Sequence, residues 1–145
     1  MKQVPLIPSS ACGPLGVKHL PRLWLKVSLR TQDKLQDDYH AIGPGFDRLT
    51  LEALGIQQEA FESFIAQERP SYIELEAWII KTQGPKLSPR KIAAHNRLVS
   101  NYQHEAETRA QILDAAGIAD DPTLLTAEML NNLDDWTAFH KNVLE

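Results

Sequence analysis

Residues 18–30 read KHLPRLWLKVSLR, and this segment decides the fold class of the chain. Its apolar residues recur at intervals of three or four, which places them on one face of an α-helix. These residues are Leu20, Leu23, Trp24 and Val27. Proline is tolerated in the first turn of a helix, so Pro21 places the helix start near His19 to Arg22. We therefore expect a helix from there to about Lys34, with one face in the core.

The same helix carries a row of basic residues at intervals of four. The row consists of Lys18, Arg22, Lys26 and Arg30, and His19 lies beside it. Like charges at this spacing repel by about 0.2–0.5 kcal/mol per pair in water, and by more where water is excluded. Leu25 and Leu29 adjoin the row on the side away from the main apolar face, so we expect neighbours on both flanks. The enclosed part of the row therefore needs negative charge nearby.

Two sources of negative charge remain open from the sequence. In the first, an acidic residue of the chain pairs with the row; the candidates are Asp37, Asp38, Asp47 and Glu76. In the second, Arg22 and Lys26 bind an external phosphate or carboxylate, and His19 and Asp47 border the site. The candidate ligand-binding residues are accordingly His19, Arg22, Lys26 and Asp47.

The remaining helical spacing predicts an all-α, single-domain bundle of about six or seven helices over residues 1–145. No run of residues has the alternation of a strand. Further helices are expected over Phe46 to Leu54 with a glycine cap at Gly55, over Gln58 to Gln67, from the capping box at Ser71, from Ser88 and Pro89 toward Gly117, and from Thr126. Residues 91–116 form one helix or two, with any break in YQHEAE at 102–107. A separate last helix is expected to open at Asp134 and Asp135, and Trp24, Trp78 and Trp136 are assigned to the core.

The segment LQDDYHAIGPGFDRLTLEALGI at residues 35–56 could form a metal loop, an anion-binding turn or an irregular connection. Its acids lack the alternate spacing and terminal glutamate of an EF-hand. With one cysteine in the chain, no thiolate zinc cluster can form, so we expect no metal and no cofactor. The glycines match neither a P-loop nor a dinucleotide fingerprint. The simplest interpretation is an entry turn in which Asp47 satisfies the start of the next helix.

Composition narrows the function classes and the compartment. The chain has a net charge of −4 and no recognisable nucleic-acid motif, so we expect no nucleic-acid partner. No apolar run approaches the roughly 20 residues of a membrane span. Residues 1–14 are expected to form an extended, mobile arm, because the apolar run from Val4 to Ile7 is too short for a secretory signal. A single cysteine fits a reducing, cytoplasmic location.

Four blocks of the sequence carry a family resemblance. They are GPLGVKHLPRLWLKVSL at 13–29, DDYHAIGPGFDRLTLEALGI at 37–56, SYIELEAWI at 71–79 and LNNLDDWTAFH at 130–140. In these blocks the chain resembles the bacterial family catalogued as domain of unknown function 5069. The resemblance implies a small single-domain bacterial protein. It transfers no catalytic residue, because the family has no assigned activity.

Two functional hypotheses follow from the residues. The first is a non-enzymatic cytoplasmic protein that binds a protein partner or a small anionic ligand through Arg22 and Lys26. The second is an enzyme on a small phosphate or carboxylate substrate, in which His19 or His140 exchanges a proton and Arg22 orients the substrate. The oligomeric state does not follow from the sequence.

Overall fold

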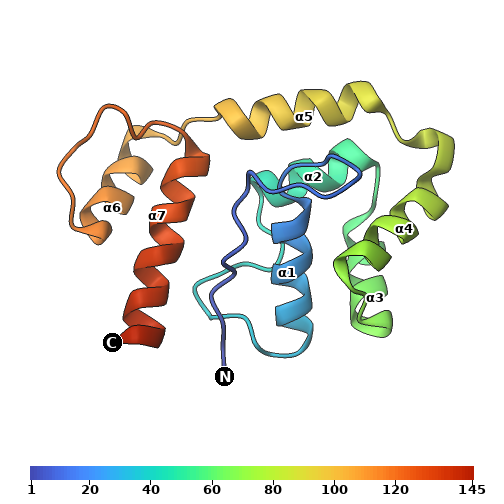
Figure 1. Ribbon diagram of the computed structural model, residues 1–145, viewed down its shortest axis with the longest axis horizontal. Helices are drawn as coiled ribbons and strands as arrows, with labels where there is room; N and C mark the ends of the chain where they lie inside the picture. The colour runs from blue at the N-terminus through green and yellow to red at the C-terminus, as the bar shows by residue number, and fades with distance from the viewer.

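The protein, described over residues 1–145 by a computed structural model, consists of helices and connecting segments with no named strand (Figure 1). This confirms the expected all-α fold and the number of helices. The seven α-helices are α1 (Leu20–Thr31), α2 (Phe46–Leu54), α3 (Gln58–Glu68), α4 (Tyr72–Gln83), α5 (Pro89–Asn101), α6 (Ala106–Ala116) and α7 (Ala127–Phe139). A short 3₁₀ helix, η1 (Gly84–Lys86), follows α4, and a short π-helix, η2 (His140–Leu144), follows α7. No helix is both long enough and apolar enough to cross a lipid bilayer.

Local sequence signals set most of the helix boundaries. Gly55 and Gly117 adopt the left-handed conformation at the ends of α2 and α6, with φ of 72° and 77°, which an L side chain rarely adopts. Ser71 and Glu74 form the expected capping box at the start of α4. The segment 102–107 does interrupt the long helical pattern, since α5 ends at Asn101 and α6 begins at Ala106.

The expected helix boundary at Asp134 and Asp135 is wrong. Both residues lie inside α7, which runs without a break from Ala127 to Phe139. Aspartate is common in the first turn of a helix, and this preference suggested a start there. In the structure Asp135 is instead 3% exposed and makes a tertiary contact.

The main hydrophobic core is built by α1 to α4 and the segment before α1. Its eleven buried members are Val17, Leu20, Leu23, Val27, Leu51, Leu54, Ile56, Phe61, Ile65, Leu75 and Ile79. None of them comes from α5, α6 or α7. The periodic apolar residues of α1 therefore pack in or against the core, as their spacing predicts.

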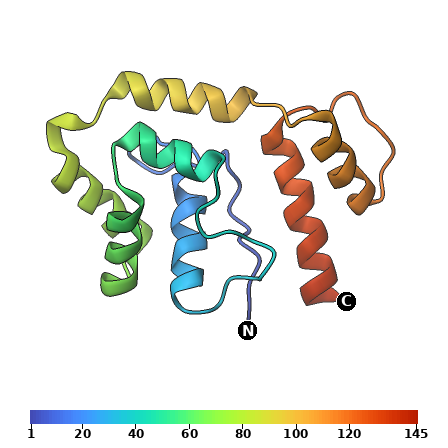
Figure 2. The ribbon, with the colours of Figure 1, turned by 180° about the vertical axis from the view of Figure 1, so that it is seen from behind.

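Helices α6 and α7 form a hairpin that stands beside this core (Figures 1 and 2). The hairpin buries Leu113, Ala127 and Leu130 between its own helices and the end of α5. In Figure 2, α5 runs across the top of the molecule and joins the two parts. The space between α1 and α7 is therefore bounded by side chains from two separately packed units.

The N-terminal arm is extended and packs against the helices. Gln3 forms an isolated bridge with Leu35, and Lys2 pairs with Asp37 at 2.5 Å. Val4 and Ser9 are buried, at 5% and 1% exposure. The arm thus covers one side of α1 and brings backbone carbonyls to the basic row.

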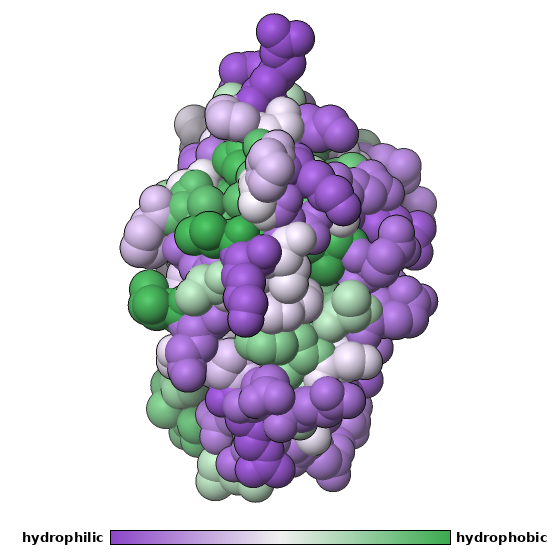
Figure 3. Space-filling view, turned by 90° about the vertical axis from the view of Figure 1, so that its right-hand side faces the viewer, coloured by the Kyte–Doolittle hydropathy of each residue, from purple (hydrophilic) through white to green (hydrophobic).

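The outer surfaces carry isolated apolar side chains. Figure 3 shows the side formed by α3 and α4, where green apolar patches are separated by purple polar residues. Ile73 and Ile80 are 59% and 51% exposed, respectively.

The assignment of Trp136 to the core is wrong, because its side chain is 60% exposed. The reason is that α7 turns Asp135 toward α1, and the next residue points about 100° away.

Candidate functional site

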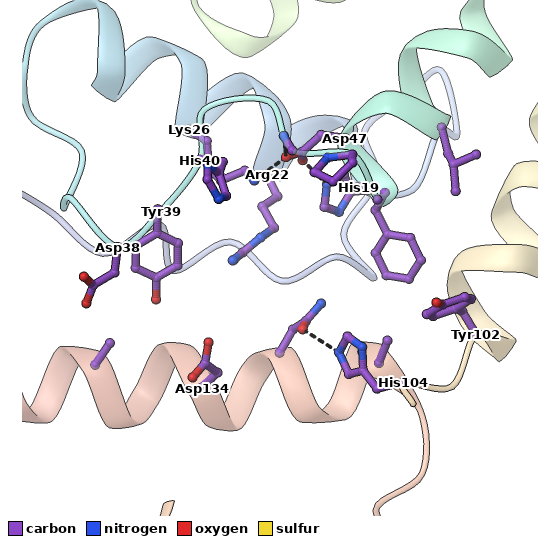
Figure 4. Close-up of a pocket in the computed structure, with 18 residues that line it drawn as sticks. His19, Arg22, Lys26, Asp38, Tyr39, His40, Asp47, Tyr102, His104 and Asp134 are labelled. Atoms are coloured by element: carbon purple, nitrogen blue, oxygen red, sulfur yellow. Dashed lines mark hydrogen bonds and ion pairs between the residues drawn. The ribbon is translucent and has the colours of Figure 1, made fainter. Parts of the chain in front are cut away.

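A cleft of about 640 Å³ lies between α1, α2 and the preceding loop on one side and α7 on the other (Figure 4). All four residues selected from the sequence line it: His19, Arg22, Lys26 and Asp47. The loop before α2 contributes Asp38, Tyr39 and His40, and the far wall contributes Tyr102, His104, Asn131 and Asp134. A cavity of this size falls within the range of about 300–1,000 Å³ typical of small-molecule sites.

Asp47 is the centre of a buried polar network at the base of the cleft. Its carboxylate accepts hydrogen bonds from Lys26 Nζ at 2.5 Å, His19 Nε2 at 2.6 Å and the Gly43 amide at 2.8 Å. It does not cap α2, whose start has no side-chain cap. Asp47 lies in the first turn of α2, as expected, but its carboxylate bonds to the entry turn and to α1 rather than to an N–H group of the helix start.

The pKa of Asp47 reflects this network. Burial by itself would raise the pKa, but the hydrogen bond from His19 and the charge of Lys26 outweigh burial and lower the pKa to about 2. Burial lowers the pKa of Lys26, because removing water disfavours the ammonium form. Asp47 offsets part of that cost. Lys26 and Asp47 therefore form an enclosed ion pair.

His19 is held as a neutral imidazole. Burial lowers its pKa, and both ring nitrogens are occupied. Nε2 donates to Asp47, and Nδ1 accepts from the Ser9 hydroxyl at 2.9 Å. The backbone of His19 has a φ of 74°, a left-handed conformation uncommon for residues other than glycine. The strain therefore lies in the backbone of His19, while both nitrogens of the ring have hydrogen-bond partners.

Arg22 crosses from α1 to α7. Its guanidinium donates to both carboxylate oxygens of Asp135, at 2.6 and 3.1 Å, and to the carbonyls of Pro5 and Ile7 in the arm. Tyr39 donates to the same carboxylate at 2.9 Å. Arg22 and Asp135 are far apart in the sequence, and no local pattern links them. Asp135 was therefore not among the acids expected to pair with the basic row.

The basic row therefore finds partners within the chain. Asp47 and Asp135 neutralise Lys26 and Arg22. Lys18 donates to the Ser100 hydroxyl, and Arg30 donates to the carbonyl of Tyr39. The internal source of negative charge is thus real, with Asp47 as one of its expected members.

Several donors and acceptors in the cleft have no partner within the protein. Asp47 is the only side chain that accepts from the Lys26 ammonium, which leaves two of its three N–H groups uncommitted. The Nε of Arg22 makes no hydrogen bond, and neither does the side chain of His40. Asp38 and Asp134 have no cationic partner. A ligand could bond to these groups without breaking the buried pairs.

The end of the cleft next to α5 is aromatic. Phe46 and Tyr102 meet edge to face with ring centres 5.8 Å apart, and Tyr102 and His104 do so at 6.1 Å. His104 also bonds to Asn131 of α7 at 3.2 Å. In Figure 4 Tyr102 and His104 stand at the opposite end of the cleft from Asp38 and Tyr39. Sequence reasoning missed this end, since its residues come together only when α5 packs against α2 and α7 packs against the end of α5.

A serine, a histidine and an aspartate, the residue types of a catalytic triad, are hydrogen-bonded in series as Ser9, His19 and Asp47. A substrate in the cleft could not reach the serine. Ser9 is 1% exposed and is not part of the cleft wall. His140, the other proposed acid or base, is exposed in η2 and does not line the cleft. Neither histidine selected from the sequence is placed for proton transfer to a bound molecule. No group of three or more His, Cys, Asp or Glu side chains is positioned to hold a metal ion.

Comparison with known proteins gives one match. No protein with a curated description and no solved structure matches the chain. The family model described as a domain of unknown function, DUF5069, matches residues 7–135, a span that contains both ion pairs and every wall of the cleft except Ala138. The chain belongs to the DUF5069 family.

Proposed function

We propose that this protein binds a small organic anion in the cleft between α1 and α7. The observation that carries the proposal is the position of Lys26, a residue only 7% exposed that lines the cavity and whose ammonium group has one acceptor for three N–H groups. Buried cations gain most from additional hydrogen-bond acceptors, because water is excluded from them. An anionic oxygen in the cleft would supply such an acceptor.

Arg22 supports the same proposal. Its guanidinium lies in the cleft wall and is fixed by Asp135 and two carbonyls, so little side-chain entropy is lost when a ligand binds to the free Nε. His40 adds a further donor at the mouth of the cleft. Arg22 is held in place before any ligand arrives, whereas His40 is exposed and has no hydrogen bond that fixes its side chain.

Thermal-shift measurements with acetate and inorganic phosphate test the proposal, because a ligand that binds only the folded state raises the melting temperature. Ala138→Trp should fill the cleft and abolish the shift. Ala77→Trp, on the exposed side of α4, is the matched control and should retain it. A protein that neither probe stabilises, or a shift that survives in Ala138→Trp, would overturn the proposal.

One observation favours an enzyme as the second candidate. His40 lines the cleft beside the cations and has no hydrogen bond within the protein. Partial burial, Asp135 and Asp38 raise the pKa of Asp134 on the opposite wall. A free imidazole and a carboxyl group with a raised pKa are suited to exchange protons with a substrate between them.

Turnover of p-nitrophenyl phosphate and p-nitrophenyl acetate tests this candidate. His40→Gln should abolish any turnover, whereas His140→Gln, an exposed histidine outside the cleft, should leave it unchanged. Equal turnover in both variants would exclude His40 from the chemistry.

We further propose that the protein acts in the bacterial cytoplasm. Cys12 is exposed and unpaired, which suits a reducing compartment. Alkylation of intact bacterial cells that produce the chain, followed by mass spectrometry, should recover Cys12 as a free thiol in the soluble fraction. Recovery of the chain in an oxidising compartment or a membrane pellet would contradict this location.

A further inference from the structure

We infer that the ligand is an aromatic carboxylate, a planar ring that carries a single negative charge. This inference rests on the proposed function and specifies the chemical class of the ligand. It depends on the aromatic end of the cleft, the arrangement of charge along its walls and the way His19 joins the two.

The aromatic end offers a ring-shaped contact surface. Phe46, Tyr102 and His104 surround it, and Leu49 and Ala127 complete the wall. Tyr102 is 47% exposed although it lies in a cavity, and its hydroxyl makes no hydrogen bond. A ring placed here would cover the open side of Tyr102 and make the edge-to-face or stacked contacts that aromatic groups prefer.

His19 connects this end with the cations. Its ring packs against Phe46 with ring centres 5.5 Å apart, and its Nε2 bonds to the carboxylate that holds Lys26. The aromatic surface and the free N–H groups of Lys26 are therefore separated by the side chains of Asp47 and His19. An aromatic carboxylate that lies along these two side chains places its ring toward Phe46 and its negative group toward Lys26.

The wall charges limit the ligand to one negative charge. Lys26 with Asp47 and Arg22 with Asp135 are each neutral as pairs. Asp38 and Asp134 line the same cleft with no cationic partner. One carboxylate can sit against the cations at the base. Both acids are exposed, so water weakens their effect, but their repulsion still disfavours a second negative charge on the ligand.

Isothermal titration of the full chain near pH 8 with four probes tests the inference. The probes are benzoate, acetate, phenyl phosphate and benzylammonium. Benzoate should bind at least tenfold more tightly than acetate because it adds the ring contacts. It should also bind more tightly than phenyl phosphate, which is a dianion at this pH.

Two variants locate the ring. Tyr102→Ala should weaken benzoate binding at least fivefold and leave acetate binding unchanged. Trp136→Ala removes a more exposed aromatic side chain outside the cleft and should change neither affinity. Thermal unfolding of each variant verifies that it folds before titration.

The outcomes separate the inference from the proposed function. Equal affinities for benzoate and acetate, or a Tyr102→Ala variant with unchanged benzoate affinity, would overturn the aromatic ring while small-anion binding stands. Tighter binding of phenyl phosphate than of benzoate would overturn the inference that the ligand carries one negative charge. Binding of benzylammonium alone, or of no probe, would overturn the proposed function itself.

Discussion

Arg22 and Asp135 are 113 positions apart in the chain and form a two-bond ion pair that joins α1 to α7. Both side chains are almost completely buried, at 6% and 3% exposure. The hydrophobic core contains no residue from α6 or α7, so polar contacts such as this pair help to join the core unit to the hairpin. Since the cleft lies between the same two units, the pair also fixes the width of the cleft.

Breaking this pair should destabilise the protein strongly. Arg22→Ala or Asp135→Ala leaves an unpaired charge in a buried site, which costs about 3–5 kcal/mol. Arg22→Met combined with Asp135→Leu removes both charges and should cost less than either single change. Urea unfolding followed by circular dichroism measures each free energy of unfolding.

Lys2→Ala provides the control for this prediction. Lys2 and Asp37 also form a short ion pair, but they lie at the exposed end of the arm, where water screens the charges. The urea midpoint of Lys2→Ala should match that of the wild type. A double variant as unstable as the sum of the two single variants would show that Arg22 and Asp135 act independently.

Acid should destabilise the protein in two stages, both with the same sign. The His19 pKa lies below its usual value of 6.5, so as the pH falls below 6.5 the unfolded state binds a proton that the folded state does not. The free energy of unfolding then decreases by at most about 1.4 kcal/mol per pH unit. Asp47, with a pKa lowered from 3.8 to about 2, adds a second loss as the pH falls from about 4 toward 2.

Urea unfolding at a series of pH values tests both stages. His19→Gln should flatten the dependence just below pH 6.5 and leave the loss below pH 4 in place. His140→Gln should keep the wild-type profile, since His140 is exposed. A free energy of unfolding that increases as the pH falls from 6.5 to 5 would show that His19 is protonated in the folded state.

Gly13 should not tolerate a side chain. A Cβ at this position would overlap the Tyr72 ring and the carboxylate of Glu76, a residue that is 4% exposed and also bonds to the Leu15 amide. Gly13→Ala should therefore cost about 1–3 kcal/mol, the usual range for overpacking. Gly43→Ala is the control, because its nearest contact would be an ordinary 3.5 Å to Asp47. Equal stability of both variants in urea would contradict the crowding at Gly13.

Local signals explain how far the sequence could predict the fold. Glycine caps, the Ser71 capping box and the Ser88–Pro89 start act within one or two turns, so residue types alone set those boundaries. The requirement of the basic row for negative charge was also predictable, because like charges on one helix face repel wherever they are placed.

The partner of Arg22 and the aromatic end of the cleft could not be predicted in this way. The first depends on where α7 packs, and the second on how α5 packs against α2. Helical spacing gives the faces of a helix but not its neighbours. Asp135 resembled a helix start because its position next to Asp134 matches that preference. The tertiary ion pair with Arg22 overrides this local signal.

The two aromatic residues Phe61 and Trp136 provide the last test of the packing. Both lie on apparently apolar helical faces, yet Phe61 is 0% exposed in the main core and Trp136 is 60% exposed on α7. Phe61→Ala should cost about 3–5 kcal/mol, because it loses buried surface and leaves a cavity. Trp136→Ala should stay within about 0.5 kcal/mol of the wild type, as exposed substitutions usually do. Urea unfolding with circular dichroism detection compares them without relying on tryptophan fluorescence. A large loss from Trp136→Ala would mean that this side chain packs against another surface in solution, and size-exclusion chromatography would then show whether that surface is a second copy of the chain.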